Sequence, residues 1–203
     1  MSKKFTYLAL GDSYTIGEQV PHAENFPNQT VTLLKKQDFD VADPVIIAVT
    51  GWTTDELAAS IREHNLHEIF SFVTLLIGVN NQYRGRDIEN YKKEFRDLLE
   101  QAIVFANGNP HHVYVLSIPD WGVTPFAEGK DRQKIAAEID AYNKANKEIT
   151  EEYKCYYLYI TDSTREAAKD KTLVAGDGLH PSSIEYAIWA EHLAPLVAEE
   201  LRK

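Results

Sequence analysis

Two short segments of this chain hold a serine, an aspartate and a histidine that could act together in nucleophilic catalysis. Ser13 lies in the turn Gly11-Asp12-Ser13-Tyr14, and Asp177 precedes His180 by three residues in a loop that also holds a glycine and a proline. This spacing lets the Asp177 carboxylate bind one nitrogen of the His180 ring while the other nitrogen faces outward. A histidine oriented in this way can take a proton from a serine hydroxyl, which is otherwise a poor nucleophile. Read alone, each segment is also compatible with a glycine turn or a surface loop that caps a helix.

Two further segments place a glycine or a neutral amide at similar turns. Gly51, in Thr50-Gly51-Trp52, allows another group to approach its backbone closely. Asn80, in Gly78-Val79-Asn80-Asn81, offers a neutral side-chain donor. Each segment has a plain alternative, which is a simple turn at Gly51 and a turn-forming asparagine at Asn80.

These segments share a position in the expected secondary structure. Apolar runs of strand length predict β-strands over residues 5–10, 45–50, 72–77, 112–117 and 156–160. The second and third runs, VIIAVT and FVTLLI, are nearly continuous and predict strands buried on both faces, as in a parallel sheet. Gly11, Gly51 and Gly78 each follow directly after a predicted strand. Because ligands bind beyond the carboxyl ends of the strands in such a sheet, these turns are where a site is expected.

Amphipathic helices are expected between the strands. Apolar residues recur three or four positions apart over 88–105 and 135–153, and capping-box patterns predict helix starts at Thr53, Ser163 and Ser182. Strands that alternate with helices over the whole length predict an α/β fold with right-handed crossovers. We expect a single domain over residues 1–203, because this length fits one domain and no linker or repeat interrupts it.

Together, the four segments resemble the consensus blocks of the SGNH hydrolases, the GDSL-like lipase and esterase family. The family's blocks GDS, an isolated Gly, GxND and DxxH read here as GDSY, TGWT, GVNN and DGLH, in the same order from residue 11 to residue 180. Tyr14 stands where the family often has leucine, and Asn81 where it usually has aspartate. We expect Asn81 to alter a hydrogen bond that supports its loop. The α/β-hydrolase signature G-x-S-x-G is absent around Ser13.

The resemblance implies a three-layer α/β/α sandwich with a five-stranded parallel sheet, of the flavodoxin-like SGNH type. It implies Ser13 as the nucleophile, with Asp177 and His180 completing the catalytic triad. It also implies an oxyanion hole formed by the backbone N–H groups of Ser13 and Gly51 and the side-chain amide of Asn80. No metal or organic cofactor is required. A histidine base further predicts activity that rises with pH across neutrality.

The expected function is that of a serine esterase working through an acyl-serine intermediate. Its ester substrates could carry a small acyl, lipid-like or O-acetylated sugar group, and thioesters or lysophospholipids fit the same residues. An acyltransferase with the same triad and a non-catalytic ligand-binding module are the alternatives. Tyr14, Trp52, Tyr83 and Trp121 follow predicted strand ends and are candidates to line the pocket, the alternative for each being ordinary loop packing.

The overall composition restricts the partners and the location of this chain. With 21 basic and 31 acidic side chains its net charge is -10, which disfavours nucleic acid and anionic membranes as partners. One cysteine excludes an intrachain disulfide, and no Cys/His cluster has zinc spacing. No apolar run approaches the roughly 18 residues of a membrane span, and the apolar stretch 5–10 behind Lys3 and Lys4 is too short for a signal peptide. We expect a cytoplasmic enzyme with a small-molecule substrate and an oligomeric state that the sequence leaves open.

Overall fold

The centre of the protein is one sheet of five parallel strands, seen in a computed structural model that describes residues 4–203. The strands are β1 (Tyr7–Asp12), β2 (Val45–Val49), β3 (Phe72–Leu76), β4 (Val113–Leu116) and β5 (Tyr156–Leu158). Their order is β2-β1-β3-β4-β5, and every neighbouring pair is parallel. This is the flavodoxin-like order. The expected start of the domain at residue 1, and Lys3, lie outside the described residues.

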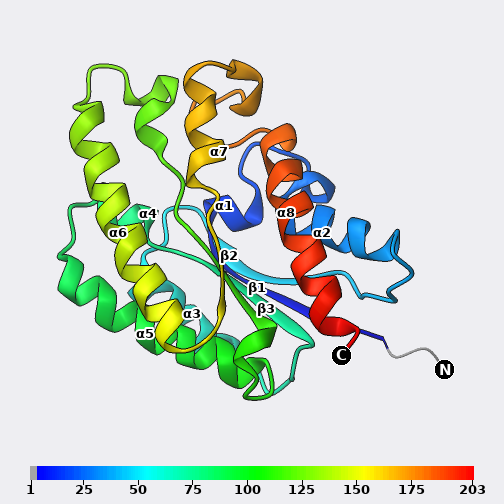
Figure 1. Ribbon diagram of the computed structural model, residues 1–203. Helices are drawn as coiled ribbons and strands as arrows, with labels where there is room; N and C mark the ends of the chain where they lie inside the picture. The colour runs from blue at the N-terminus through cyan, green and yellow to red at the C-terminus, as the bar shows by residue number, and fades with distance from the viewer. Residues whose placement is uncertain (1–3) are drawn as a thin grey trace.

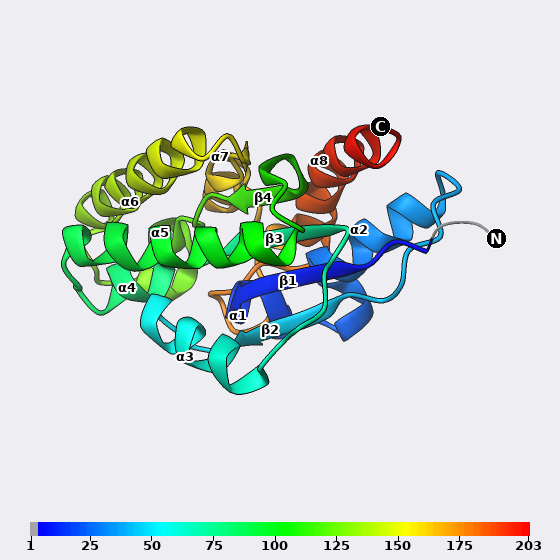
Figure 2. The same cartoon turned by 90° about the horizontal axis from the view of Figure 1, so that it is seen from below.

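Helices cover both faces of the sheet (Figure 1, Figure 2). The helices α2 (Phe26–Lys35) and α8 (Ser183–Leu201) pack together on one side, and α3 (Thr54–His64), α5 (Ile88–Phe105) and α6 (Arg132–Glu152) lie on the other. The short helices α1 (Ser13–Ile16), α4 (Val79–Tyr83) and α7 (Thr161–Arg165) follow β1, β3 and β5. The expected three-layer α/β/α sandwich with a five-stranded parallel sheet is therefore confirmed.

The strand β1 begins and ends two residues later than the sequence predicts. Gly11 and Asp12 belong to it, because Gly11 pairs with Ala48 of β2 and Asp12 pairs with Val49. The apolar pattern stops at Leu10, whereas the backbone pairing continues. Consequently, helix α1 starts at the residue that directly follows the strand.

The strand β2 is more exposed than its continuous apolar sequence predicts. It lies at the edge of the sheet, and its residues Val45 and Val49 are 43% and 47% exposed. The central strand β3 is buried along its whole length. An apolar run does not distinguish an edge strand from a central one, so the expectation of burial on both faces is wrong for β2.

Two of the three predicted helix starts are present. Thr53 caps α3 with a complete capping box, in which Glu56 accepts from the Thr53 backbone N–H at 2.9 Å. Ser182 caps α8. The prediction at Ser163 is wrong, because the N-cap of α7 is Ile160, three residues earlier, and Ser163 lies inside the helix. The start of α3 matters for the site, since the Gly51 turn leads directly into it.

Candidate active site

Ser13 is the first residue of α1 and lies at the carboxyl end of β1. The Asp12 carboxylate accepts from the Tyr14 backbone N–H at 3.0 Å and so caps this helix. Only glycine fits at position 11, because a Cβ there would lie 2.0 Å from Oγ1 of Thr15. This tight strand-to-helix turn fixes Ser13 at the edge of the sheet where a parallel α/β fold binds its ligands.

The loop before α8 joins Asp177 to His180. Asp177 Oδ2 lies 2.6 Å from His180 Nδ1, and Asp177 Oδ1 accepts from the backbone N–H groups of Leu179 and His180 at 2.9 and 3.0 Å. Burial opposes ionisation of Asp177, but these hydrogen bonds outweigh it and hold the pKa of the carboxyl below its usual value. A charged carboxylate on Nδ1 leaves Nε2 as the ring nitrogen that can serve another group.

Residues far apart in the sequence converge on one cavity of about 130 Å³. Ser13, Asn80 and His180 all line it, from α1, α4 and the loop before α8. Within residues 4–203, no hydrogen bond joins the Ser13 hydroxyl to the His180 ring. Such bonds are often long in enzymes without substrate and shorten when it binds. The cavity thus brings the predicted nucleophile and base together, and their catalytic roles stay predictions.

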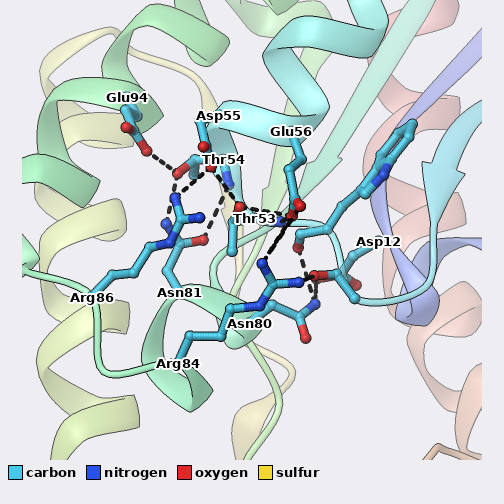
Figure 3. A network of polar contacts seen from close by, with 12 residues as sticks. Asp12, Thr53, Thr54, Asp55, Glu56, Asn80, Asn81, Arg84, Arg86 and Glu94 are labelled. Atoms are coloured by element: carbon cyan, nitrogen blue, oxygen red, sulfur yellow. Dashed lines mark hydrogen bonds and ion pairs between the residues drawn. The ribbon is translucent and has the colours of Figure 1, made fainter.

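Asn80 and Gly51 lie on neighbouring segments that hydrogen bonds hold together. Figure 3 shows Asn80 next to Asp12. The Asn80 side-chain amide donates to the Trp52 carbonyl at 3.0 Å and to Asp12 Oδ2 at 3.3 Å. Gly51 adopts a φ of 85°, a left-handed conformation that favours glycine, and its carbonyl accepts from Arg84 at 2.5 Å. Asn80 lines the cavity itself. The Gly51 segment is linked to Asn80 through the hydrogen bond that the Trp52 carbonyl accepts.

We expect Asn80→Ala to lower kcat by about 10²–10³-fold, because the substitution removes a neutral donor from the wall of the cavity. KM should change little if this donor acts mainly on the transition state. Steady-state kinetics on a soluble ester measure both constants. Gln101→Ala, which removes an amide from α5, serves as the control and should leave kcat unchanged. A rise in KM alone would assign Asn80 to substrate binding instead.

Asp12 has an environment that the sequence does not reveal, since a capping aspartate is usually exposed. It is fully buried, and burial raises the pKa of this carboxyl to about 7 although the Tyr14 N–H and Asn80 donate to it. An ordinary aspartate titrates near 4. Asp12 therefore keeps its proton in the folded protein at pH values where the unfolded chain has lost it.

We expect the titration of Asp12 to lower the free energy of unfolding as the pH rises from about 4 to about 7. Over this range the unfolded chain releases a proton that the folded chain retains, so a rising pH favours unfolding. Urea denaturation at several pH values between about 5 and 8 measures the slope. Asp12→Asn should show a shallower decline than the wild type. Parallel curves for the two proteins would contradict the expectation.

Aromatic side chains form one wall of the cavity. Three of the four candidates, Tyr14, Tyr83 and Trp121, line it, whereas Trp52 packs against the hydrophobic core. Phe126 lines the cavity as well, although its turn has the sequence of an ordinary loop and carries no signal of this position. The Tyr83 ring centroid lies 5.3 Å from that of Trp121 and 6.2 Å from that of Phe126. The wall is therefore apolar and partly open, since Tyr83 is half exposed.

Possible metal ligands do not gather in the part of the chain that the structure describes. Among residues 4–203, no group of three or more His, Cys, Asp or Glu side chains could hold a metal ion. Each helix in this range is too short or too polar to cross a bilayer.

The fold is similar to that of several solved structures. TesA has a TM-score of 0.74 at 16% identity, over 95% of this chain and 97% of that chain. The acetylxylan esterase Axe2 from Geobacillus stearothermophilus has a TM-score of 0.73 at 19% identity, over 95% and 94%. The psychrotrophic esterase EstA from Pseudoalteromonas sp. has a TM-score of 0.69 at 14% identity, over 98% and 99%. At these identities the likeness shows the fold.

The family of this chain is shown by a match to a family model, whereas the comparison with individual curated proteins found none. No curated protein has significant sequence similarity to this chain. Residues 9–188 match the GDSL-like Lipase/Acylhydrolase family, a span that contains Ser13, Asn80 and His180. This match agrees with the resemblance of the four sequence blocks, and together with the esterases of similar fold it supports a hydrolase. The chain therefore belongs to the GDSL-like lipase/acylhydrolase family.

Proposed function

We propose that this chain is a serine esterase that hydrolyses carboxylic esters of short acyl groups. The proposal is carried by the cavity that Ser13, Asn80 and His180 share, together with the 2.6 Å contact between His180 and Asp177. A nucleophile, a base, an orienting carboxylate and an oxyanion donor are the groups that acyl transfer to a serine needs. Membership of the GDSL-like family supports the same reaction.

The first half of the reaction acylates Ser13. His180 Nε2 takes the proton of the Ser13 hydroxyl as its oxygen attacks the carbonyl carbon of the ester, and Asp177 stabilises the imidazolium that forms. Negative charge develops on the carbonyl oxygen, which Asn80 and the backbone N–H groups of Ser13 and Gly51 bind. To bind the oxyanion, the Asn80 amide gives up one of its two hydrogen bonds. It gives up the bond to Asp12, because at 3.3 Å this bond is longer and weaker than the 3.0 Å bond to the Trp52 carbonyl.

The second half releases the acid. His180 gives its proton to the oxygen of the leaving alcohol, which leaves an ester between Ser13 and the acyl group. The same imidazole then takes a proton from water as the water oxygen attacks the acyl carbon. When the tetrahedral intermediate collapses, the Ser13 oxygen leaves with the proton held by His180, and the carboxylic acid departs.

The size of the cavity supports a short acyl group. Its volume of about 130 Å³ is smaller than the roughly 300–1,000 Å³ of pockets for drug-sized ligands. A panel of p-nitrophenyl esters of increasing chain length, run beside acetylated sugars, tests the proposal. Acetylated sugars are included because Axe2, which shares the fold, is named an acetylxylan esterase. We expect the highest kcat/KM for the shortest acyl groups, and a maximum at the longest chains would contradict a short-acyl esterase.

Two further experiments separate the alternative functions of the site. Product partition with added alcohols distinguishes a hydrolase from an acyltransferase, because only the latter transfers most of the acyl group to the alcohol. A fluorophosphonate probe would leave a non-catalytic binding module unlabelled. A cytoplasmic location and a single domain over residues 1–203 belong to this proposal too, and cell fractionation and limited proteolysis test them.

A further inference from the structure

A chain of hydrogen bonds connects α3, α4 and α5 behind the candidate oxyanion donors (Figure 3). Asn81 Oδ1 accepts from the Thr54 backbone N–H at 3.1 Å, and Asn81 Nδ2 donates to the Thr54 hydroxyl at 2.7 Å. The Thr54 hydroxyl donates to Oε2 of Glu94. Asn81 and Thr54 are fully buried, and Glu94 is partly buried.

The direction of this chain is fixed by its chemistry. A backbone N–H can only donate, so the atom of Asn81 that faces it must be the amide oxygen. The amide NH₂ of Asn81 must therefore face the Thr54 hydroxyl, which accepts its proton. That hydroxyl has one proton of its own, and Glu94 is the acceptor for it.

This chain of hydrogen bonds lies directly behind the candidate oxyanion donors, which are the Asn80 side chain and the Gly51 backbone. Asn81 follows Asn80 in α4, and Thr54 begins α3 two residues after Trp52, whose carbonyl binds the Asn80 amide. The link between Asn81 and Thr54 is thus a second tie between the same two segments, and Glu94 anchors it to the long helix α5. Any shift of Thr54 relative to Asn81 would change the spacing between Asn80 and the Gly51 turn.

We propose that Asn81, Thr54 and Glu94 form a positioning unit that sets the spacing of the oxyanion donors, and that Asn81 and Glu94 depend on each other. The proposal rests on the esterase function proposed above. An aspartate at position 81, which is usual in the family, would accept from both the N–H and the hydroxyl of Thr54. Thr54 would then have no proton left for Glu94, and two carboxylates would compete for one hydroxyl. A glutamine at position 94 restores a full set of bonds, because its amide NH₂ can donate to Thr54 while Thr54 donates to the aspartate.

A double-mutant cycle tests this dependence. Asn81→Asp should lower kcat by about 10- to 100-fold with little change in KM, since a small misplacement of a donor affects the transition state most. Glu94→Gln alone should have a small effect, because its amide oxygen can accept from Thr54. Adding Glu94→Gln to Asn81→Asp should restore most of the lost kcat, with the direction of the chain reversed. Effects that simply add would overturn the proposal.

The test has one control and one pair of replacement variants. Glu94→Gln combined with Asn107→Asp, which makes the same chemical change at an exposed position remote from Thr54, should give additive effects. If Asn81→Asp does not fold, Thr54→Ser and Thr54→Val replace it. The serine keeps the hydroxyl and should retain kcat, whereas the valine should lose it, and equal kcat values would overturn the proposal.

Thermal denaturation of the four cycle proteins separates this proposal from the esterase proposal. The midpoints should show the same rescue whether or not the wild type hydrolyses an ester, because the bonds are present without substrate. A wild type without turnover would refute the esterase function and leave the hydrogen-bond chain supported. Additive shifts in the midpoints would refute the chain even in an active enzyme.

Discussion

Ser13→Ala should reduce ester turnover by about 10⁶-fold in kcat, to the level that binding and oxyanion donors sustain without a nucleophile. The reason is that Ser13 is the serine that shares a cavity with His180, and no acyl-enzyme can form on alanine. The change should leave the fold intact, since the Ser13 side chain caps no helix and Asp12 supplies the cap of α1. Steady-state kinetics and labelling by a fluorophosphonate probe measure the loss.

Ser183→Ala is the matched control for this experiment. Ser183 lies in the first turn of α8 and bonds to Glu24, so its loss removes a serine hydroxyl without altering the cavity. This variant should keep its activity and its labelling. Near-normal hydrolysis by a pure, folded Ser13→Ala sample would reject Ser13 as the nucleophile.

Asp177→Asn should lower kcat by about 10⁴-fold, because an asparagine imposes the wrong tautomer on His180. The backbone N–H groups of Leu179 and His180 bind Asp177 Oδ1 and would select the amide oxygen of the asparagine for that position. The amide NH₂ would then face His180 Nδ1 and donate to it. The ring proton would move to Nε2, which could no longer accept a proton from Ser13. A pH–rate profile and kcat measure the effect.

Asp170→Asn provides the comparison for Asp177→Asn. Asp170 also accepts from a nearby backbone N–H, that of Thr172, but it binds no histidine. The substitution should leave kcat unchanged, and both variants should keep the thermal midpoint of the wild type within a few degrees. A loss of activity below about 10-fold in Asp177→Asn would show that the carboxylate does not orient the base.

The candidate site was largely predictable because its parts follow strand ends. Gly11, Gly51 and Gly78 each come after an apolar run, and parallel strands place their carboxyl ends at one edge of the sheet. The Asp177–His180 contact was predictable for a different reason, since both residues lie in one short loop. The α/β class followed from the alternation of strands and helices, and the flavodoxin-like sandwich followed from the resemblance of the four sequence blocks to the SGNH family.

Other features could not be read from local patterns. β2 has the apolar composition of a central strand but lies at the edge, because strand order is decided by how the helices pack and not by the strand itself. Phe126 reaches the cavity from a turn without a recognisable signal. The helix start expected at Ser163 lies at Thr161 instead, because the Ser163 hydroxyl donates to the Ile160 carbonyl and to Glu185 of α8 and so caps no helix.

Features that depend on neighbours along the chain can be predicted from the amino-acid sequence: the Asp177–His180 pair, the cap at Thr53, and the turns that carry Ser13 and Asn80. Features that depend on residues distant in the sequence are set when the elements pack together. The burial that raises the pKa of Asp12 and the chain from Asn81 through Thr54 to Glu94 are of this kind. The physical reason is that burial and hydrogen bonds between separate helices arise when the layers pack, and periodicity records only which face of an element is apolar.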